Sequence, residues 1–357
     1  MLTSAAVLMG TERSGTNLLA RMLDAHPLVA SPPPAHLVRR LAEHRPRYGN
    51  LGDDRNWREL LRDTADLLAT ALAPWRSTWT AERLAAEVRP RGLVPLLRHV
   101  HAREVQARGK RRLFLKENHV HRFLPLLQRT FPGLKVVWLV RDPRDMALSW
   151  KNSPVRRGDV LRAAGVWRDD QRGALAVLGC LEPGRDVHLL TYEDLLANPE
   201  GELARLCRFL ELPFDQAMLT FHRRREAAAQ ARATDLWRNL VQPVQADNTR
   251  KYRAGLDRDE IAYVESVCGP EMRALGYAPE IADPPPVAEL RARLRPRERW
   301  EKPGWATVPA AERERLRARA AVVARMAARP LDLDCLRRHS TGGERPAATV
   351  DREAIHA

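Results

Sequence analysis

The chain has 357 residues, of which 44% are hydrophobic and 29% charged, proportions that are typical of a soluble globular protein. It contains no run of 18 apolar residues, so we expect no membrane-spanning helix. The formal net charge of +15 favours a polyanionic ligand, whereas the even spread of basic residues disfavours a nucleic-acid reader. The four cysteines have no metal-binding or redox spacing: Cys180, Cys207, Cys268 and Cys335.

A strand, a small-residue loop and a helix start are predicted at the N-terminus. The apolar run Ala5–Met9 is followed by Gly10 and Gly15, which have the spacing of a Walker phosphate loop. Thr16 stands where that motif needs its lysine, and the cation is Arg13 instead. Two glycines and a helix N-terminus still let backbone N–H groups approach an anion. The loop therefore predicts a site for a phosphate-like group and disfavours a nucleoside triphosphatase.

This loop resembles the 5′-phosphosulfate loop of the sulfotransferases that use 3′-phosphoadenosine 5′-phosphosulfate (PAPS). Their loop reads R-S-G-T-T-L-L, and many bacterial and Golgi members continue into a helix that ends in L-D-A-H-P. Here the helix ends in Leu23–Pro27, which has that sequence. The resemblance implies cofactor contacts from the residues of the loop: Arg13, Ser14, Gly15, Thr16 and Asn17.

A second segment carries the same resemblance. The apolar run Lys135–Val140 is typical of a parallel strand that is buried on both faces. It continues into Arg141 and, two helical turns later, Ser149, and this resembles the family's 3′-phosphate segment. The resemblance implies that Arg141 and Ser149 bind the 3′-phosphate, for which an arginine fork is well suited. The alternative, a Walker B strand with Asp142 on magnesium, fails without a Walker lysine.

Further matches extend the resemblance to about residue 280. Tyr192 opens a Y-E-D-L segment, whose tyrosine in the family lies near the adenine or the 3′-phosphate. An ordinary packing role for this aromatic ring is equally consistent with the sequence. Arg250 and Lys251 resemble the late basic segment that approaches the 3′-phosphate, although a solvated charge pair is the alternative. Residues 257–277 resemble the closing helix of the family.

Transfer of a sulfuryl group needs a cation for the departing phosphate and a base for the acceptor proton. Arg13 is the first choice for the cation, and Lys116 is the second, because Leu115–Glu117 resembles a family strand that ends in a lysine facing the cleft. No metal ion is expected.

The general base has two candidate positions. In tyrosine-directed Golgi members a glutamate follows the L-D-A-H-P helix; the matching stretch here has no carboxylate, but His36 lies two residues beyond that place. In cytosolic members a histidine follows the lysine by two positions, where this chain has Asn118 between Glu117 and His119. The other interpretations are that Glu12 or His121 is the base, or that His36 merely caps a helix.

The predicted architecture is α/β, a three-layer sandwich with a central parallel sheet. Strands are expected at 5–9, 112–115, 135–140 and 187–190, with a helical insertion at about 52–108 that lines the acceptor side. The sulfotransferase domain is expected to span 1–280. Residues 281–357 are predicted to form a linker, a basic helix at 310–329 and a disordered tail at 340–357.

The resemblance implies a PAPS-dependent enzyme that makes an O-sulfate on a small-molecule, glycan, lipid or peptide acceptor. The alternatives are a small-molecule or nucleotide kinase and a non-catalytic protein that binds 3′-phosphoadenosine 5′-phosphate (PAP). Only six of the 60 basic residues are lysines, a bias that is typical of a GC-rich bacterial genome. Because the phosphate loop begins within ten residues of Met1, no leader is expected and the predicted location is the cytoplasm. Self-association is compatible with the sequence.

Overall fold

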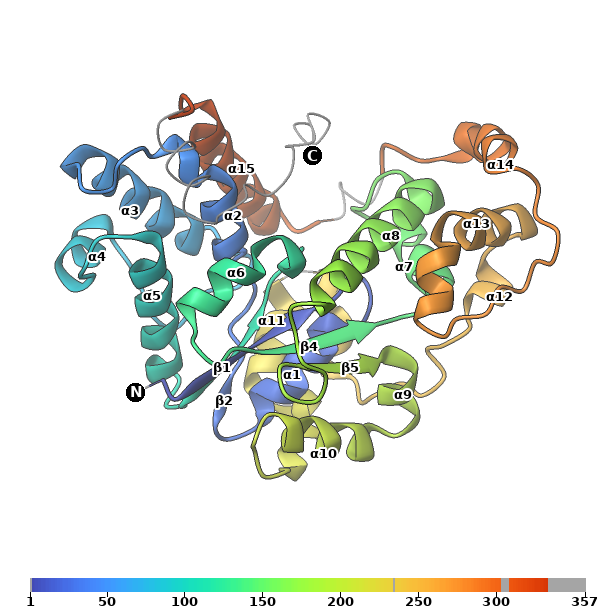
Figure 1. Ribbon diagram of the computed structural model, residues 1–357, viewed down its shortest axis with the longest axis horizontal. Helices are drawn as coiled ribbons and strands as arrows, with labels where there is room; N and C mark the ends of the chain where they lie inside the picture. The colour runs from blue at the N-terminus through green and yellow to red at the C-terminus, as the bar shows by residue number, and fades with distance from the viewer. Residues whose placement is uncertain (1, 234, 303–307, 333–357) are drawn as a thin grey trace.

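The computed structural model describes residues 2–233, 235–302 and 308–332. A five-stranded parallel sheet lies at its centre, with the strands in the order β2-β3-β1-β4-β5 (Figure 1). The four predicted strands are confirmed, each to within one residue, whereas the two-residue strand β2 is too short to show a pattern. The strands are β1 Ser4–Met9, β2 Val29–Ala30, β3 Arg112–Lys116, β4 Lys135–Val140 and β5 Val187–Thr191.

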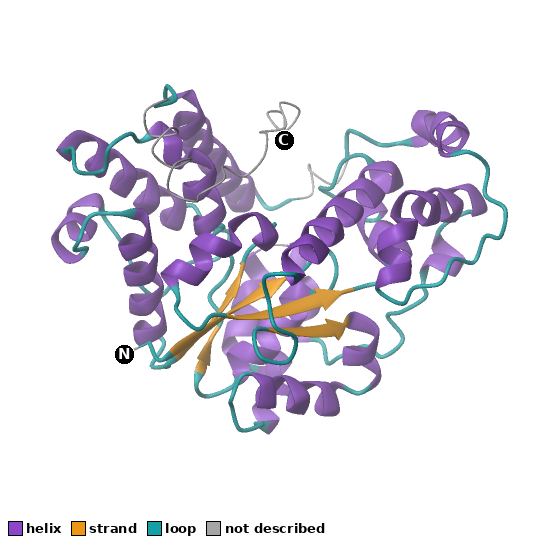
Figure 2. Cartoon of the chain, in the orientation of Figure 1, coloured by secondary structure: helices purple, strands orange, loops and turns teal. Residues whose placement is uncertain are grey.

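Helices cover both faces of the sheet, as predicted for a three-layer α/β fold (Figure 2). Successive side chains of a strand point to opposite faces, so Val7 and Met9 enter one apolar core and Ala6 and Leu8 the other. The first core is covered by α5 Leu93–Ala107, α6 Val120–Thr130, α7 Pro143–Lys151 and α8 Asp159–Leu178. The second is covered by α1 Thr16–Ala25, α9 Tyr192–Ala197 and α10 Pro199–Phe209.

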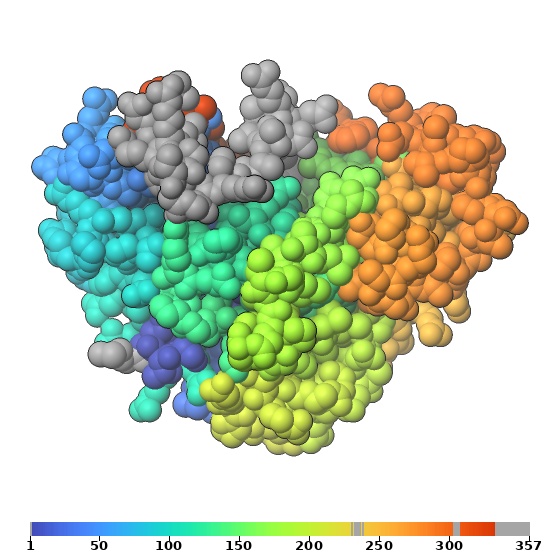
Figure 3. Space-filling view, in the orientation of Figure 1, coloured from blue at the N-terminus to red at the C-terminus, as the bar shows by residue number. Residues whose placement is uncertain are grey.

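The helical insertion between β2 and β3 forms one side of the molecule, blue to cyan in the space-filling view (Figure 3). The apolar residues that predicted an amphipathic helix are buried in its second helix: Trp57, Leu60, Leu61, Leu67 and Leu68. The insertion consists of α2 Leu37–His44, α3 Asp54–Ala69 and α4 Ala81–Glu87, followed by α5.

The chain after β5 is helical. The predicted closing helix corresponds to α13 Arg258–Ala274, and the predicted basic helix corresponds to α15 Ala310–Ala328. The predicted tail at 340–357 lies outside the described residues. None of the helices in the described part of the chain combines the length and apolar character needed to cross a membrane. The remaining elements are α11 Arg225–Ala233, α12 Tyr252–Gly255 and α14 Val287–Leu294, with short 3₁₀ helices at 45–47, 216–218, 221–223, 235–241 and 295–297.

The carboxyl ends of the central strands lie at one edge of the sheet. Leu8 is paired with Lys116 on one side of β1, and Met9 is paired with Trp138 on the other. The chain leaves β1 for β2 and β3 on one side and then crosses to β4 on the other. Ligands of open parallel sheets bind at the carboxyl edge where the strand order changes direction, which here is the end of β1.

Candidate active site

The loop between β1 and α1 depends on glycine for two separate reasons. Gly15 adopts the left-handed conformation, with φ of 84°, and a Cβ there would lie 2.3 Å from the ring of Tyr192. Gly10 lies against β4, where a Cβ would lie 2.7 Å from the carbonyl oxygen of Leu139. Close packing against β4 and α9 therefore requires the glycine spacing that the sequence shows.

Four segments that are far apart in the sequence meet beside this loop. The guanidinium carbon of Arg141, at the end of β4, lies 4.4 Å from the centre of the Tyr192 ring. Arg141 also donates to the carbonyl oxygens of Arg13 and Asn248, both at 3.1 Å. The side-chain amide of Asn248 donates to the hydroxyl of Tyr192 at 2.8 Å. The structure thus brings together the predicted Arg13, Arg141 and Tyr192, and it adds Asn248.

Ser149 completes the cluster. It lies on α7, and its Oγ accepts a hydrogen bond from Nε of Arg13 at 3.2 Å. Two buried polar atoms here have no hydrogen-bond partner among the described residues: Oγ of Ser14 and Nε of Arg141. Leaving such atoms unpaired is costly, and a phosphate oxygen would satisfy them. The cluster therefore fits a ligand that carries phosphate groups, such as PAPS.

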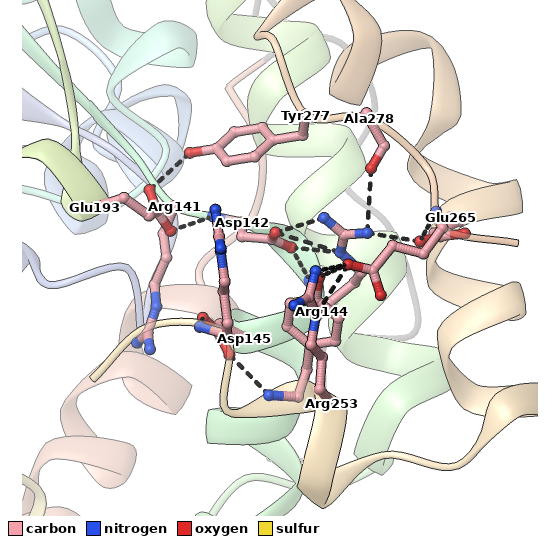
Figure 4. Close-up of polar contacts among 12 residues, drawn as sticks. Arg141, Asp142, Arg144, Asp145, Glu193, Arg253, Glu265, Tyr277 and Ala278 are labelled. Carbon is pink, nitrogen blue, oxygen red and sulfur yellow. Dashed lines mark hydrogen bonds and ion pairs between the residues drawn. The ribbon is translucent and has the colours of Figure 1, made fainter. Parts of the chain in front are cut away.

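A network of polar contacts surrounds Asp142, the residue after Arg141 (Figure 4). The carboxylate of the neighbouring Asp142 accepts from the Arg144 backbone N–H at 2.9 Å and binds its guanidinium at 2.7 Å. Arg144 in turn binds Glu265 of α13 at 2.7 Å. Asp142 therefore caps α7 and anchors Arg144, which is a structural role and differs from that of a Walker B magnesium ligand.

The basic pair Arg250 and Lys251 lies beside α7. Asp145 of α7 accepts from the backbone N–H of Arg250 at 2.6 Å and from that of Tyr252 at 3.0 Å. These bonds fix the backbone of the late segment, while the side chains of Arg250 and Lys251 are exposed. Their contact with a 3′-phosphate stays a prediction.

The side of the site next to α2 contains a histidine–carboxylate pair. His36 immediately precedes α2, and its Nδ1 lies 3.5 Å from Oε2 of Glu117, at the end of β3. The other carboxylate oxygen of Glu117 accepts from the backbone N–H of Val38 at 3.0 Å. The His36 side chain is 27% exposed, whereas that of Glu117 is 2% exposed. His36 is thus the more exposed member of the pair, and its buried Nδ1 lies close to Oε2 of Glu117 without a hydrogen bond between them. The side chain of His36 forms no helix-capping bond, so it does not cap α2.

The surroundings of this pair change its protonation. Burial raises the pKa of Glu117 to about 7, against the opposing bond from Val38. Burial, reinforced by Lys116, lowers the pKa of His36 well below its ordinary value. Burial also lowers the pKa of Lys116 to about 8, although Glu12 and Glu117 oppose the change. His36 is therefore neutral near pH 7 and has a ring nitrogen that can accept a proton, while its lowered pKa also makes it a weaker base than a free imidazole.

A second histidine–carboxylate pair joins His119, which immediately precedes α6, to Asp170 of α8. Nδ1 of His119 lies 2.7 Å from Oδ1 of Asp170, and the His119 side chain is 24% exposed. Burial lowers the pKa of the neighbouring His121 to about 4, in the same direction as that of His36. Glu117 and His119, which are close neighbours in the sequence, thus belong to two different pairs.

Glu12 belongs to the loop and lies close enough to interact electrostatically with His36 and His119, one histidine from each pair. Its carboxylate is 2.6 Å from the guanidinium of Arg156 and accepts from the side-chain amide of Asn118. Burial alone would raise the pKa of Glu12, but Arg156 and Lys116 lower it below its ordinary value. This ionised, paired carboxylate is a poor general base. Arg156, Asp170 and Asn248 carried no signal in the sequence, because each lies outside the recognisable motifs.

The sequence model described as the sulfotransferase family matches residues 6–216, which include the loop, both histidine–carboxylate pairs and Tyr192. The chain belongs to the sulfotransferase family. It is therefore a transferase that moves a sulfuryl group. Among the residues that the structure describes, no group of three or more histidine, cysteine or acidic side chains could hold a metal ion.

Animal protein-tyrosine sulfotransferases are among the curated relatives of this sulfotransferase. Protein-tyrosine sulfotransferase A of Caenorhabditis elegans is 24% identical over 77% of this chain and 67% of its own length. Protein-tyrosine sulfotransferase 1 of Danio rerio is 24% identical over 77% of this chain and 72% of its own.

Solved structures show the same fold. The sulfotransferase domain of the Synechococcus PCC 7002 olefin synthase matches with a TM-score of 0.54 and 22% identity, over 78% of this chain and 96% of that domain. The sulfotransferase domain of the curacin biosynthetic pathway matches with a TM-score of 0.51 and 20% identity, over 78% of this chain and 99% of that domain. The predicted family and fold class are therefore confirmed.

Proposed function

We propose that this sulfotransferase transfers the sulfuryl group of PAPS to a hydroxyl acceptor and releases PAP. The observation that carries the proposal is the convergence of Arg13, Ser149, Arg141 and Tyr192 around a glycine loop that lacks the Walker lysine. Arg141 and Ser149 would hold the 3′-phosphate, while the loop N–H groups and Ser14 would hold the 5′-phosphosulfate.

The chemistry needs one proton acceptor and one cation. His36 would accept the proton of the acceptor hydroxyl at Nε2, because its Nδ1 faces Glu117. The acceptor oxygen then forms the new S–O bond, and the electron pair of the broken S–O bond stays on the 5′-phosphate of the nucleotide. Arg13 would neutralise that charge, and Lys116 is the second candidate.

The acceptor class is proposed from the relatives. Two of them are named for protein tyrosine, so a tyrosyl hydroxyl in a peptide is the first acceptor to test. Glycan, lipid and small-molecule hydroxyls form the second set. A bacterial origin and a cytoplasmic location stay predictions from the sequence, as does self-association.

Two measurements test the proposal. In a thermal-shift assay, PAP without magnesium should stabilise the protein more than ATP with magnesium. The reverse result would favour a kinase. Mass spectrometry of tyrosyl peptides and other hydroxyl acceptors incubated with PAPS should then detect a sulfate adduct. PAP binding without an adduct on any acceptor would indicate a non-catalytic nucleotide-binding protein.

A further inference from the structure

Helix α15 lies beyond the part of the chain that the family model matches, yet it packs against the acceptor side. It lies beside α2 and α3 (Figure 1). Arg325 binds Asp63 of α3 at 2.6 Å, and Arg329 binds the same carboxylate at 2.9 Å. Val322 and Met326 are buried in the first apolar core, the one that also contains Val7 and Met9 of β1. These contacts make α15 a fixed part of the wall that holds His36.

One arginine of α15 reaches the residue before His36. Arg319 donates to the carbonyl oxygen of Leu67 at 2.7 Å and to the carbonyl oxygen of Ala35. No described carboxylate forms a salt bridge with it, and burial lowers the pKa of its guanidinium to about 10. A largely desolvated cation whose bonds to the described residues all go to carbonyl groups costs stability. Such a stability cost, a buried cation without a carboxylate partner among the described residues, is expected at a functional site.

The geometry points to Arg319 as a positioning residue for the acceptor-side base, an inference that rests on the proposed function. His36 adopts the left-handed conformation, with φ of 49°, which is strained for a residue with a side chain. By holding the carbonyl of Ala35, Arg319 keeps this turn in place and keeps the imidazole opposite Glu117. Residues inside the family match and a helix outside it thus both contribute to the surroundings of His36.

The position of Arg319 has an electrostatic consequence as well. Its positive charge makes protonation of His36 less favourable and supports the neutral imidazole that a general base requires. Removal of the charge should therefore raise the pKa of His36. The charged groups that face His36 come from four elements: Arg39 of α2, Lys116 and Glu117 at the end of β3, Glu12 of the loop, and Arg319 of α15.

The test compares three variants of the full-length chain. Arg319→Met keeps the aliphatic stem but removes the charge and the donors, while Arg319→Lys restores the charge. Arg325→Met is the matched control, because Arg329 still binds Asp63 and holds α15 on α3 while Arg319 keeps its bond to the His36 turn. Nuclear magnetic resonance of ¹⁵N-histidine protein, with the His36 signal assigned from His36→Gln, reads the imidazole pKa without any need for turnover.

We expect Arg319→Met to lower kcat at least about 10-fold with unchanged PAP affinity, and to shift both the His36 titration and the acidic limb of the pH–rate profile to higher pH. Arg319→Lys should restore the titration, and Arg325→Met should alter only thermal stability. If Arg319→Met and Arg325→Met behave alike, Arg319 is merely structural and the inference is overturned. If Arg319→Met unfolds, Arg319→Lys decides instead. A wild-type kcat and a wild-type His36 titration in Arg319→Lys would support the role of the positive charge, whereas a changed His36 titration would contradict it. A wild-type protein without sulfotransfer would instead refute the proposed function.

Discussion

Nε of Arg13 lies 3.2 Å from Oγ of Ser149 and joins the loop after the first strand to the helix after the fourth. The two residues are 136 positions apart, and each belongs to a different phosphate segment of the family pattern. The contact places the Arg13 guanidinium between the segments that would hold the two ends of the nucleotide. A cation in that position is suited to the charge that develops on a leaving phosphate.

This contact makes the contribution of Arg13 to the reaction testable. Arg13→Ala should lower kcat by about 10²-fold or more, because a cation that stabilises the leaving group acts mainly in the transition state. PAP affinity should fall by less than kcat does. The measurements are steady-state sulfotransfer and PAP titration calorimetry. An equal loss in both would mean that Arg13 binds the ground state only, and Lys116→Ala would then be the decisive variant.

Arg141 should discriminate between nucleotides with and without a 3′-phosphate. Arg141→Ala removes a cation whose charge-assisted bonds contribute about 1.5–3 kcal/mol each, so PAP affinity should fall at least ~10-fold. Adenosine 5′-phosphosulfate lacks the 3′-phosphate, and its affinity should fall less. Titrations of the wild type and the variant with both nucleotides check this. Equal losses would assign Arg141 to the packing of Tyr192 rather than to the 3′-phosphate.

The contact between Gly15 and Tyr192 predicts a large effect from a single methyl group. Gly15→Ala combines left-handed strain with a Cβ that would lie 2.3 Å from the ring. Gly133 is the matched control, since its φ is 72° and a Cβ there would meet nothing within 4 Å. Gly133→Ala should cost about 1 kcal/mol of unfolding free energy through strain alone. Gly15→Ala should cost more unfolding free energy than Gly133→Ala and should also weaken PAP binding. Urea denaturation and PAP titration measure the two effects. A similar loss of unfolding free energy in both variants would contradict the close packing of Gly15 against Tyr192.

The raised pKa of Glu117 predicts how stability depends on pH. Its folded-state pKa of about 7 lies above the ordinary 4.5, so the carboxyl stabilises the fold below pH 4.5 and this stabilisation is lost as the pH rises toward 7. Glu117→Gln removes the titration, so the unfolding free energy of the variant relative to the wild type should rise by up to about 3 kcal/mol over that window. Urea denaturation at several pH values measures it, and a constant difference would refute the raised pKa.

The sequence predicted the sheet and the loop and strand-end residues that the structure brings together, because local patterns encode both. A buried parallel strand appears as an apolar run such as Lys135–Val140, and the glycine loop has a fixed spacing. The structure then brings Arg13, Arg141, Ser149 and Tyr192 together, and their contact with the nucleotide stays a prediction.

The acceptor half could not be predicted in the same way, because it depends on contacts between distant segments. Nothing in the sequence near His36 indicates that Glu117, 81 residues later, lies beside its imidazole. Nor does it indicate that Arg319 of α15 donates to the carbonyl oxygen of Ala35. The same holds for His119, whose carboxylate partner Asp170 lies in the middle of α8. Such pairs follow from the path of the chain, which motif spacing does not encode.

The two histidine–carboxylate pairs therefore give rival predictions for the general base. If His36 is the base, His36→Ala should lower kcat by roughly 10²–10⁴-fold with nearly intact PAP affinity, while His119→Ala should change kcat much less. The acidic limb of the pH–rate profile should disappear in His36→Ala, because the group that must lose its proton is gone. Sulfotransfer rates at saturating PAPS, measured across pH for both variants, separate the pairs. Wild-type kcat in His36→Ala together with a large loss in His119→Ala would move the base to the His119–Asp170 pair and leave the sulfotransferase assignment intact.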